Sequence, residues 1–354
     1  MVVVGTDVHK RTHTFVAADE VGRPLGEKVA AATTAGNQAA ITWARAQFGE
    51  DLIWGIEDCR NLSARLERDL LAADQKVVRV APKLMSNTRK SARTRGKSDP
   101  IDALAVAQAV LRNPDLPVAA HDEVSRELKL LVDRREDLVA QRTSTINRLR
   151  QRVHELEPAA EPNLGSMHRP KPCEALAAWL DNQSGLLAEL AGDELADVIR
   201  LNQAIDVLAA RIGERVQTVA PALLALPGCG ELTAAKIVAE TAGVSRFRSE
   251  AAFAAHTGTA PIPVWSGNTA GRVRLNRSGN RQLNAALHRI AITQLRIPGS
   301  AGQIYYRKRL AEGKATKEAL RCLKRHLARA VYQRLHTDDQ RRQTPQHDQP
   351  KAAA

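Results

Sequence analysis

The chain has 354 residues, enough for two or three domains, and carries 52 Lys and Arg against 39 Asp and Glu, for a net charge of +13. This balance favours a polyanionic partner, either a nucleic acid or an anionic membrane surface. A membrane is the poorer choice because no stretch approaches the roughly 18 apolar residues of a spanning helix, and because the N-terminus enters a strand without a signal peptide. We therefore expect a cytoplasmic protein that binds nucleic acid.

Residues 1–120 alternate between strand and helix patterns and form the first expected domain. Strands are expected at 2–7, 13–19, 25–30, 51–57 and 76–80, and helices at 35–48, 61–73 and 99–111. Three consecutive strands with short turns come first, and strand–helix alternation follows. This order predicts an α/β domain with a mixed sheet flanked by helices, as in ribonuclease-H-like domains.

Four acidic residues lie at the ends of these elements. Asp7 closes the first strand, Glu57 closes the fourth, and Asp99 and Asp102 open the helix at 99. Carboxylates at the ends of adjacent strands, faced by a pair on a helix, suit two hard divalent cations that clamp the attacking and leaving oxygens of a phosphodiester. The four acids predict a catalytic Mg²⁺ site.

Each of these acids also has a simpler explanation. Asp99 precedes Pro100 and fits a helix N-cap, with Asp102 at N3 in an arrangement like a capping box. Asp7 fits a turn at a strand end, and Glu57 fits a surface acid. Their joint occurrence in a basic chain favours the metal site. His9 and His13, four apart on a strand, do not make a zinc pair, although His9 could contact a phosphate.

Residues 81–97 form a basic segment with no acid. Its six cations are Lys83, Arg89, Lys90, Arg93, Arg95 and Lys97. Such a run is usually a solvated surface. Beside four carboxylates, we expect it to bind phosphates of a nucleic acid.

Residues 121–220 are predicted to be helical, with apolar residues at alternating spacings of four and three. One series covers 128–156 and the second covers 195–219, and the Pro-rich segment 158–172 separates them. This pattern is typical of coiled-coil helices that either fold back antiparallel or pair between subunits, although a simple spacer is also possible. Arg135, Arg142 and Asn202 interrupt the apolar series, which indicates control of register or contact with a partner.

The helical third domain is expected over 221–336. The string Leu226-Pro227-Gly228-Cys229-Gly230, followed by small residues, predicts a helix-hairpin-helix, in which backbone N–H groups at Gly228 and Gly230 meet a DNA phosphate. A plain interhelical turn is the alternative. The polar tail, 337–354, is expected to be disordered.

Ser266-Gly267 follows a Pro-rich loop, and such a pair is most often a turn. Residues 251–311 hold nine Lys or Arg and no acid, and Arg272, Arg274, Arg277 and Arg281 follow this serine. We expect these four arginines to bind nucleic acid. If Ser266 attacked phosphorus, Arg272, Arg274 and Arg277 would also neutralise the developing charge.

Several motifs together resemble one protein family. They are Gly5-Thr6-Asp7-Val8-His9-Lys10, Ile56-Glu57-Asp58, Lys97-Ser98-Asp99-Pro100-Ile101-Asp102-Ala103, Leu226-Pro227-Gly228-Cys229-Gly230, Arg246-Phe247, His256-Thr257-Gly258-Thr259-Ala260-Pro261, Ser266-Gly267 and Arg277-Ser278-Gly279-Asn280-Arg281-Gln282-Leu283. As an ordered set over residues 2–335, they resemble the DEDD transposases of bacterial insertion sequences, recombinases that are guided by a bridge RNA. One departure is Asp58-Cys59-Arg60, where the commoner form of the family has a Thr-Gly pair after the glutamate.

The resemblance implies a RuvC-like N-terminal domain, a coiled coil and a C-terminal transposase domain. It implies that Asp7, Glu57, Asp99 and Asp102 bind magnesium and that Ser266 forms a phosphoserine link to DNA. It further implies double-stranded DNA and a structured guide RNA as partners, and dimers or tetramers whose active sites combine domains of different subunits.

Two other functions remain open. The chain could be a Holliday-junction-type nuclease in which the four acids activate water and Ser266 is structural. It could also be a non-catalytic protein that binds nucleic acid. A covalent protein–DNA adduct distinguishes the recombinase from both.

Overall fold

The computed structural model describes residues 1–57, 62–82, 84–85, 88, 98–114, 116, 118–119, 123–158, 166–276 and 279–343. The chain divides into two compact units. The first unit contains residues 1–123, 226–228 and 240–354, and the second contains 124–225 and 229–239.

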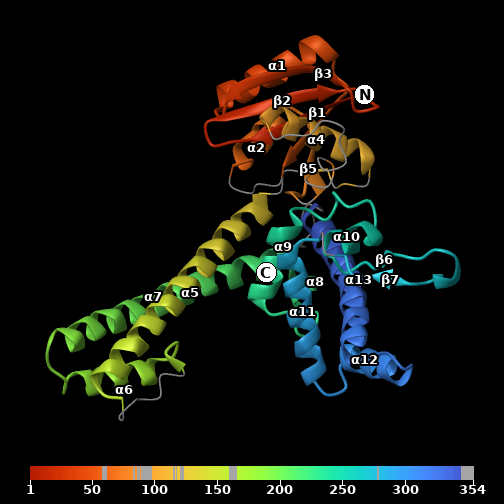
Figure 1. Cartoon of the computed structure of the whole chain (residues 1–354). Coiled ribbons are helices and arrows are strands. Elements are labelled where there is room, and N and C mark those ends of the chain that lie inside the picture. Colours follow the sequence, from red (N-terminus) through yellow and green to blue (C-terminus); the bar gives the residue numbers. More distant parts are fainter. Residues whose placement is uncertain are drawn as a thin grey trace, which may run out of the picture. The chain divides into compact units, whose positions relative to one another are not determined.

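The N-terminal part of the first unit is built on a five-stranded sheet (Figure 1). Its strands are β1 (Val2–Val8), β2 (Thr12–Ala18), β3 (Pro24–Ala31), β4 (Leu52–Glu57) and β5 (Lys76–Val80), in the order β3-β2-β1-β4-β5. β1, β4 and β5 run parallel to one another, and β2 runs antiparallel to both of its neighbours, β1 and β3. The predicted mixed sheet is confirmed, and every predicted strand is found within one residue of its expected ends.

Helices cover both faces of this sheet. On one face, α1 (Thr34–Phe48) and α2 (Ala64–Ala72) pack with Val4, Trp54 and Ile56. On the other, α4 (Asp99–Arg112) packs with Val3 and Val78. Because successive side chains of a strand point to opposite faces, odd-numbered residues of β1 and β4 face α4.

Two long helices dominate the second unit. They are α5 (Glu123–Leu156) and α7 (Leu186–Val219), with the short α6 (Pro170–Leu180) between them in the chain. Glu127 of α5 pairs with Arg215 of α7 at 3.1 Å, and farther along α5 Arg148 pairs with Glu194 at 3.2 Å. Because the residue number rises along α5 as it falls along α7, the helices run antiparallel within one chain.

The polar residues that interrupt the apolar series meet at this helix pair. Arg142 Nη1 donates to Asn202 Oδ1 at 2.8 Å, and Asn202 Nδ2 donates to the Met167 carbonyl at 2.8 Å. Apolar clusters lie on both sides, one built on Leu138 and Leu201 and the other on Leu149. A hydrogen-bonded pair between apolar clusters fixes which residues face each other, as expected for control of register.

The C-terminal region is mostly helical. Its elements are α8 (Pro221–Leu224), α9 (Glu231–Thr241), α10 (Glu250–His256), the hairpin strands β6 (Ile262–Pro263) and β7 (Val273–Arg274), the 3₁₀ turn η2 (Gly267–Thr269), α11 (Arg281–Arg296), α12 (Ala301–Ala311) and α13 (Thr316–Gln343). Buried Leu283, Leu287 and Ile290 line the inner side of α11, which packs on α12 and α13. Among the helices that the structure describes, none is long and apolar enough to cross a membrane.

The first residues of the tail that was expected to be disordered are helical. α13 continues to Gln343, past the boundary expected at 337, and only 344–354 lie outside the described residues. Leu335 and Asp338 are buried, and Asp339 pairs with Arg342 one turn later at 2.9 Å. The helix continues because this polar stretch still buries one side and forms an ion pair along its surface.

Candidate active site

Asp7 and Glu57 reach the same edge of the sheet on the same face. β1 and β4 are parallel with Thr6 opposite Ile56, so the two acids follow at equal height on strands about 4.8 Å apart. The two-residue alternation places Asp7 on the same face as Gly5, and Glu57 on the same face as Gly55. This is the face that α4 covers.

Gly5 and Gly55 allow α4 to lie directly on these strands. A Cβ on Gly5 would lie 2.0 Å from the Ala103 carbonyl oxygen, and a Cβ on Gly55 would lie 2.8 Å from Val110 Cγ2. Only glycine permits so close an approach of a helix to a strand. The glycine of the Gly-Thr-Asp motif therefore brings the acid-bearing helix onto the strand that carries Asp7.

Three side chains converge at this edge. His9 Nε2 lies 3.1 Å from Asp7 Oδ2 and 3.4 Å from Asp99 Oδ1, and the ligand atoms of the three residues lie within 4.8 Å of one another. Asp7 is buried, whereas His9 and Asp99 are exposed, so the cluster opens to solvent on one side. Asp102, one helical turn after Asp99, is buried, and Glu57 is half-buried.

The electrostatics of this cluster fit a bound cation. Burial raises the pKa of Asp7, His9 opposes this shift, and the nearby Asp102 and Asp99 carboxylates raise the pKa further. Desolvation and like charges both disfavour the ionised form of a carboxylate, and a divalent cation relieves both. The residues present therefore fit a divalent metal site.

His9 is the member of this cluster that was missing from the predicted metal site. The signal was in the sequence: a residue two after Asp7 continues on the same side of the chain. From the sequence, His9 was predicted to contact a phosphate. Its closeness to Asp99 could not be predicted, because that distance depends on how α4 packs on the sheet.

The capping interpretation of Asp99 was wrong by one residue. The N-cap of α4 is Ser98, Asp99 is the first helical residue, and the Ser98 side chain makes no capping hydrogen bond. Asp102 consequently lies beyond the N3 position that a capping box requires. Helix capping does not explain this pair of acids.

Ser266 lies on an exposed hairpin, which we call the serine hairpin and define as residues 262–274. Its strands are joined near the tip by a hydrogen bond from Val264 N to the Arg272 carbonyl at 2.9 Å. The hairpin strands β6 and β7 project from the helices around them (Figure 1). Ser266, Arg272 and Arg274 are all exposed, and Trp265 next to the serine is 56% exposed. The fold thus brings the predicted nucleophile and two predicted arginines together on one projecting element.

The root of this hairpin is tied to the end of α10. Asn276 Nδ2 donates to the Ala255 carbonyl at 3.0 Å, the backbone N–H of Asn280 donates to His256 at 2.7 Å, and Asn284 Nδ2 donates to Thr257 at 2.8 Å. The last carbonyls of a helix have no partner within it. The returning chain supplies those partners, and Asn280 lies at this junction.

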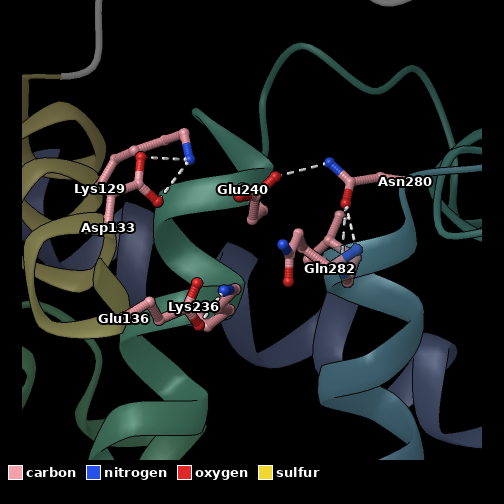
Figure 2. A network of polar contacts seen from close by, with 8 residues as sticks. Lys129, Asp133, Glu136, Lys236, Glu240, Asn280 and Gln282 are labelled. Carbon is pink, nitrogen blue, oxygen red and sulfur yellow. Dashed lines mark hydrogen bonds and ion pairs between the residues drawn. The ribbon is translucent and has the colours of Figure 1, made fainter. Parts of the chain in front are cut away.

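Asn280 is the central residue of the root (Figure 2). Its Oδ1 caps α11 by accepting from the backbone N–H groups of Gln282 and Leu283, at 2.9 and 3.0 Å. Its Nδ2 donates to Oε2 of the buried Glu240 at 2.7 Å. Lys324 of α13 donates to Asn284 Oδ1, and burial lowers the pKa of this lysine.

A separate ion pair anchors α9 within the second unit. The buried Lys236 of α9 pairs with Glu136 of α5, and Lys129 pairs with Asp133 at 3.0 Å one turn earlier on α5 (Figure 2). A buried lysine without its carboxylate is costly, so this pair fixes how α9 docks on α5.

In the turn predicted to bind phosphate, residues 226–230, the first glycine, Gly228, packs against α11. Gly228 has φ of +82°, and an added Cβ would lie 3.1 Å from Thr293 Cβ on α11. Gln294 Nε2 also donates to the Pro227 carbonyl at 2.7 Å. No atom lies within 4 Å of a Cβ built on Gly230, which directly precedes α9. Of the two glycines predicted to contact a phosphate, only Gly230 has open space beside it.

Seven predicted nucleic-acid contacts lie outside the described residues. They are Lys83, Arg89, Lys90, Arg93, Arg95, Lys97 and Arg277.

Two family models match the chain. The DEDD transposase model of IS110, described as "Transposase", matches residues 4–158, and the model described as "Transposase IS116/IS110/IS902 family" matches residues 220–307. The first match contains Asp7, Glu57, Asp99 and Asp102, and the second contains the serine hairpin. Together they cover more than half of the chain.

Full-length relatives are similar along nearly the whole chain. The insertion element IS900 uncharacterized 42 kDa protein of Mycobacterium paratuberculosis is 27% identical, covering 94% of this chain and 92% of the relative. The insertion element IS116 uncharacterized 44.8 kDa protein of Streptomyces clavuligerus is 26% identical, covering 97% and 96%. A solved structure, T. thermophilus RuvC in complex with Holliday junction substrate, matches 33% of this chain and 99% of its own, at 13% identity with a TM-score of 0.27, a likeness too distant to carry an argument.

Proposed function

Because the chain belongs to the IS110 family of transposases, which cut and transfer DNA strands, we propose that it recombines the ends of its own mobile element with two reactive centres. The first is the carboxylate site of Asp7, Glu57, Asp99 and Asp102. The second is the serine hairpin. The observation that carries this proposal is the convergence of strand-end and helix-borne acids at one open edge, with Asp7, His9 and Asp99 within 4.8 Å.

The DEDD family implies a divalent metal, and Mg²⁺ is the ion that we propose. Asp7, Glu57, Asp99 and Asp102 offer the oxygen ligands that Mg²⁺ prefers. When bound, the ion supplies stabilisation of negative charge on phosphodiester oxygens. His9 contacts the Asp7 carboxylate at 3.1 Å and holds it in orientation, as residues around metal ligands commonly do.

Ser266 is the proposed nucleophile. Its Oγ forms a bond to the scissile phosphorus, the bond from phosphorus to the departing deoxyribose oxygen breaks, and the serine proton ends on that oxygen. Arg272 and Arg274 on the same hairpin, followed by Arg277, neutralise charge on the non-bridging oxygens. A DNA hydroxyl then attacks the phosphoserine and releases the serine. Rejoining needs no ATP because the ester keeps the energy of the broken bond.

Guidance and assembly form the second part of the proposal. A structured guide RNA selects the DNA, and the active form is a dimer or tetramer. The antiparallel helices α5 and α7 act as a coiled-coil arm for that assembly, which is supported by the exposed apolar side chains of Leu130, Leu186 and Val207. The helix-hairpin-helix contacts a DNA phosphate through the N–H of Gly230.

Covalent trapping tests the serine. With guide RNA, DNA and Mg²⁺, wild-type protein should yield a serine-linked adduct that survives denaturation, whereas Ser266→Ala should bind DNA normally and yield neither adduct nor recombinant product. Ser245→Ala, at another exposed serine, is the matched control and should behave as wild type. Recombination by Ser266→Ala would refute the role, and metal-dependent cutting without an adduct would support the nuclease instead.

A further inference from the structure

One side of α11 carries a row of basic side chains, three arginines and one histidine. Arg281, His288, Arg289 and Arg296 are all exposed and, at about 100° per residue, fall within about 100° of arc around the helix. Leu283, Leu287 and Ile290 are buried on the opposite side. We call these four residues the cationic ridge. It points away from the core that α11 forms with α12 and α13.

The charge of this ridge is not neutralised within the part of the chain that the structure describes. No described ion pair involves Arg281, Arg289 or Arg296, and residues 251–311 contain no Asp or Glu. Two exposed arginines of the long helices differ: Arg200 pairs with Asp197 at 2.9 Å and Arg215 with Glu127 at 3.1 Å. Because no described acid compensates their charge, these three arginines on one helical face attract an anion from outside the chain.

The position of the ridge indicates which anion. α11 begins a few residues after β7, the hairpin strand that bears Arg274. A DNA strand bound at the serine hairpin extends beyond it on both sides. The phosphates next to the hairpin therefore need a second basic surface. Sixteen residues of helix rise about 24 Å, which matches about seven steps of B-DNA at 3.4 Å each.

The residue types also fit a backbone contact. Arginine presents a planar fork that binds phosphate oxygens in pairs. Arg281 and His288, and likewise Arg289 and Arg296, lie seven residues apart, a rise of about 10.5 Å. This is close to the major-groove width of about 12 Å, so the arginines of one ridge can meet phosphates on both walls of a groove.

We propose that the cationic ridge binds the sugar–phosphate backbone of the duplex DNA that Ser266 attacks, on the flank beyond the serine hairpin. The identity of this DNA rests on the proposed function. The contact itself is independent of sequence and needs no metal. The ridge thereby extends the DNA-binding surface beyond the hairpin by the length of α11, about 24 Å.

Salt-dependent binding tests the proposal. The triple variant Arg281→Gln, Arg289→Gln, Arg296→Gln is titrated with a duplex of about 30 base pairs of arbitrary sequence, in EDTA, between about 50 and 200 mM salt. The slope of log Kobs against log [salt] should become shallower by about 3, one for each lost phosphate contact. A stem–loop RNA of similar size should keep its slope.

The matched control removes the same charge elsewhere. The triple Arg148→Gln, Arg200→Gln, Arg215→Gln removes three exposed arginines that already pair with acids, and its DNA slope should stay as in wild type. An unchanged slope in the ridge variant, or an equal change in the control, would overturn the proposal. A loss confined to RNA would overturn the assignment to DNA.

A single-residue variant and the absence of metal from the assay allow the ridge to be tested separately from folding and from the serine chemistry. If the triple variant does not fold, Arg289→Gln alone should reduce the slope by about 1, and an unchanged slope there overturns the ridge. The assay contains no metal and forms no adduct. A failure of the serine mechanism is seen in covalent trapping, and a failure of the ridge is seen here.

Discussion

The carboxylate site and the serine hairpin are positioned in opposite ways. Asp7 is held by a sheet and by a helix that touches the strand at Gly5, so its place follows from the packing of backbone against backbone. Ser266 lies on a short hairpin with exposed neighbours, and the hydrogen bonds that fix it are concentrated at the root, around Asn280. Metal ligands need a rigid frame to hold several oxygens at fixed distances. A nucleophile that meets a large external substrate needs reach, and a projecting hairpin provides it.

The largest expected effect comes from the carboxylates. Asp7→Ala, Glu57→Ala and Asp102→Ala should each lower strand cleavage by about 10⁴-fold, because ligands of one site act as a unit. Guided cleavage assays with purified protein measure this effect. Asp51→Ala, an acid of the same domain that is 82% exposed, is the control and should keep its activity. Near-wild-type cleavage by all three variants would remove the metal-site assignment.

The second effect tests the frame itself. Gly5→Ala should destabilise the fold by about 3 kcal/mol or more, because the new methyl group meets backbone atoms of α4 that have nowhere to move. Gly271→Ala in the serine hairpin should cost only about 1 kcal/mol. There the strain comes from φ of +85° alone, and no atom lies within 4 Å of the added carbon. Chemical denaturation compares the two, and equal costs would contradict the contrast between the regions.

The third prediction concerns the hairpin root. Asn280→Asp keeps the cap of α11 but places a carboxylate against the buried Glu240, so we expect a loss of about 2 kcal/mol. Adding Glu240→Gln should restore stability and adduct formation, because the amide introduced at 240 donates the hydrogen bond that Asn280 gave. Thermal denaturation measures the stability, and covalent trapping measures adduct formation. If the double variant is no better than the single one, this hydrogen bond does not hold the root.

The last effect is a pH dependence that arises beside the root, with a small change in stability at each pH unit. Burial, together with the Arg246 guanidinium that donates to Nε2 at 3.2 Å, lowers the pKa of His256 to about 3. Between this value and the ordinary pKa near 6.5, the unfolded chain binds a proton that the folded chain does not. Stability should therefore fall as pH falls through this window, by at most about 1.4 kcal/mol per pH unit.

The control for this pH effect is His256→Gln, which has no titrating group at that position. Its thermal stability should depend less on pH between 6.5 and 4 than that of the wild type. Identical pH profiles for the two proteins would show that His256 is protonated equally in the folded and unfolded states.

Much of the N-terminal domain was predictable because its signals are local. Alternation of apolar residues marks strands within one residue of their ends, and an acid at a strand end is visible without knowledge of its neighbours. The four acids and Ser266 were therefore identified as candidates from residue type and position alone. The end of α13 was misjudged, because the burial of Leu335 and Asp338 is not evident in a polar sequence.

By itself, the sequence determined which residues are candidates for the chemistry and on which elements they lie, since the elements depend on periods of two and 3.6 residues and on the turns between them. Only the tertiary structure decided which of them meet. His9 joins Asp99 across many residues of chain, Arg142 faces Asn202, and Asn280 donates to Glu240. Such contacts depend on how elements distant in sequence pack together, and packing is set by glycines such as Gly5 whose role appears only when the opposing helix is in place.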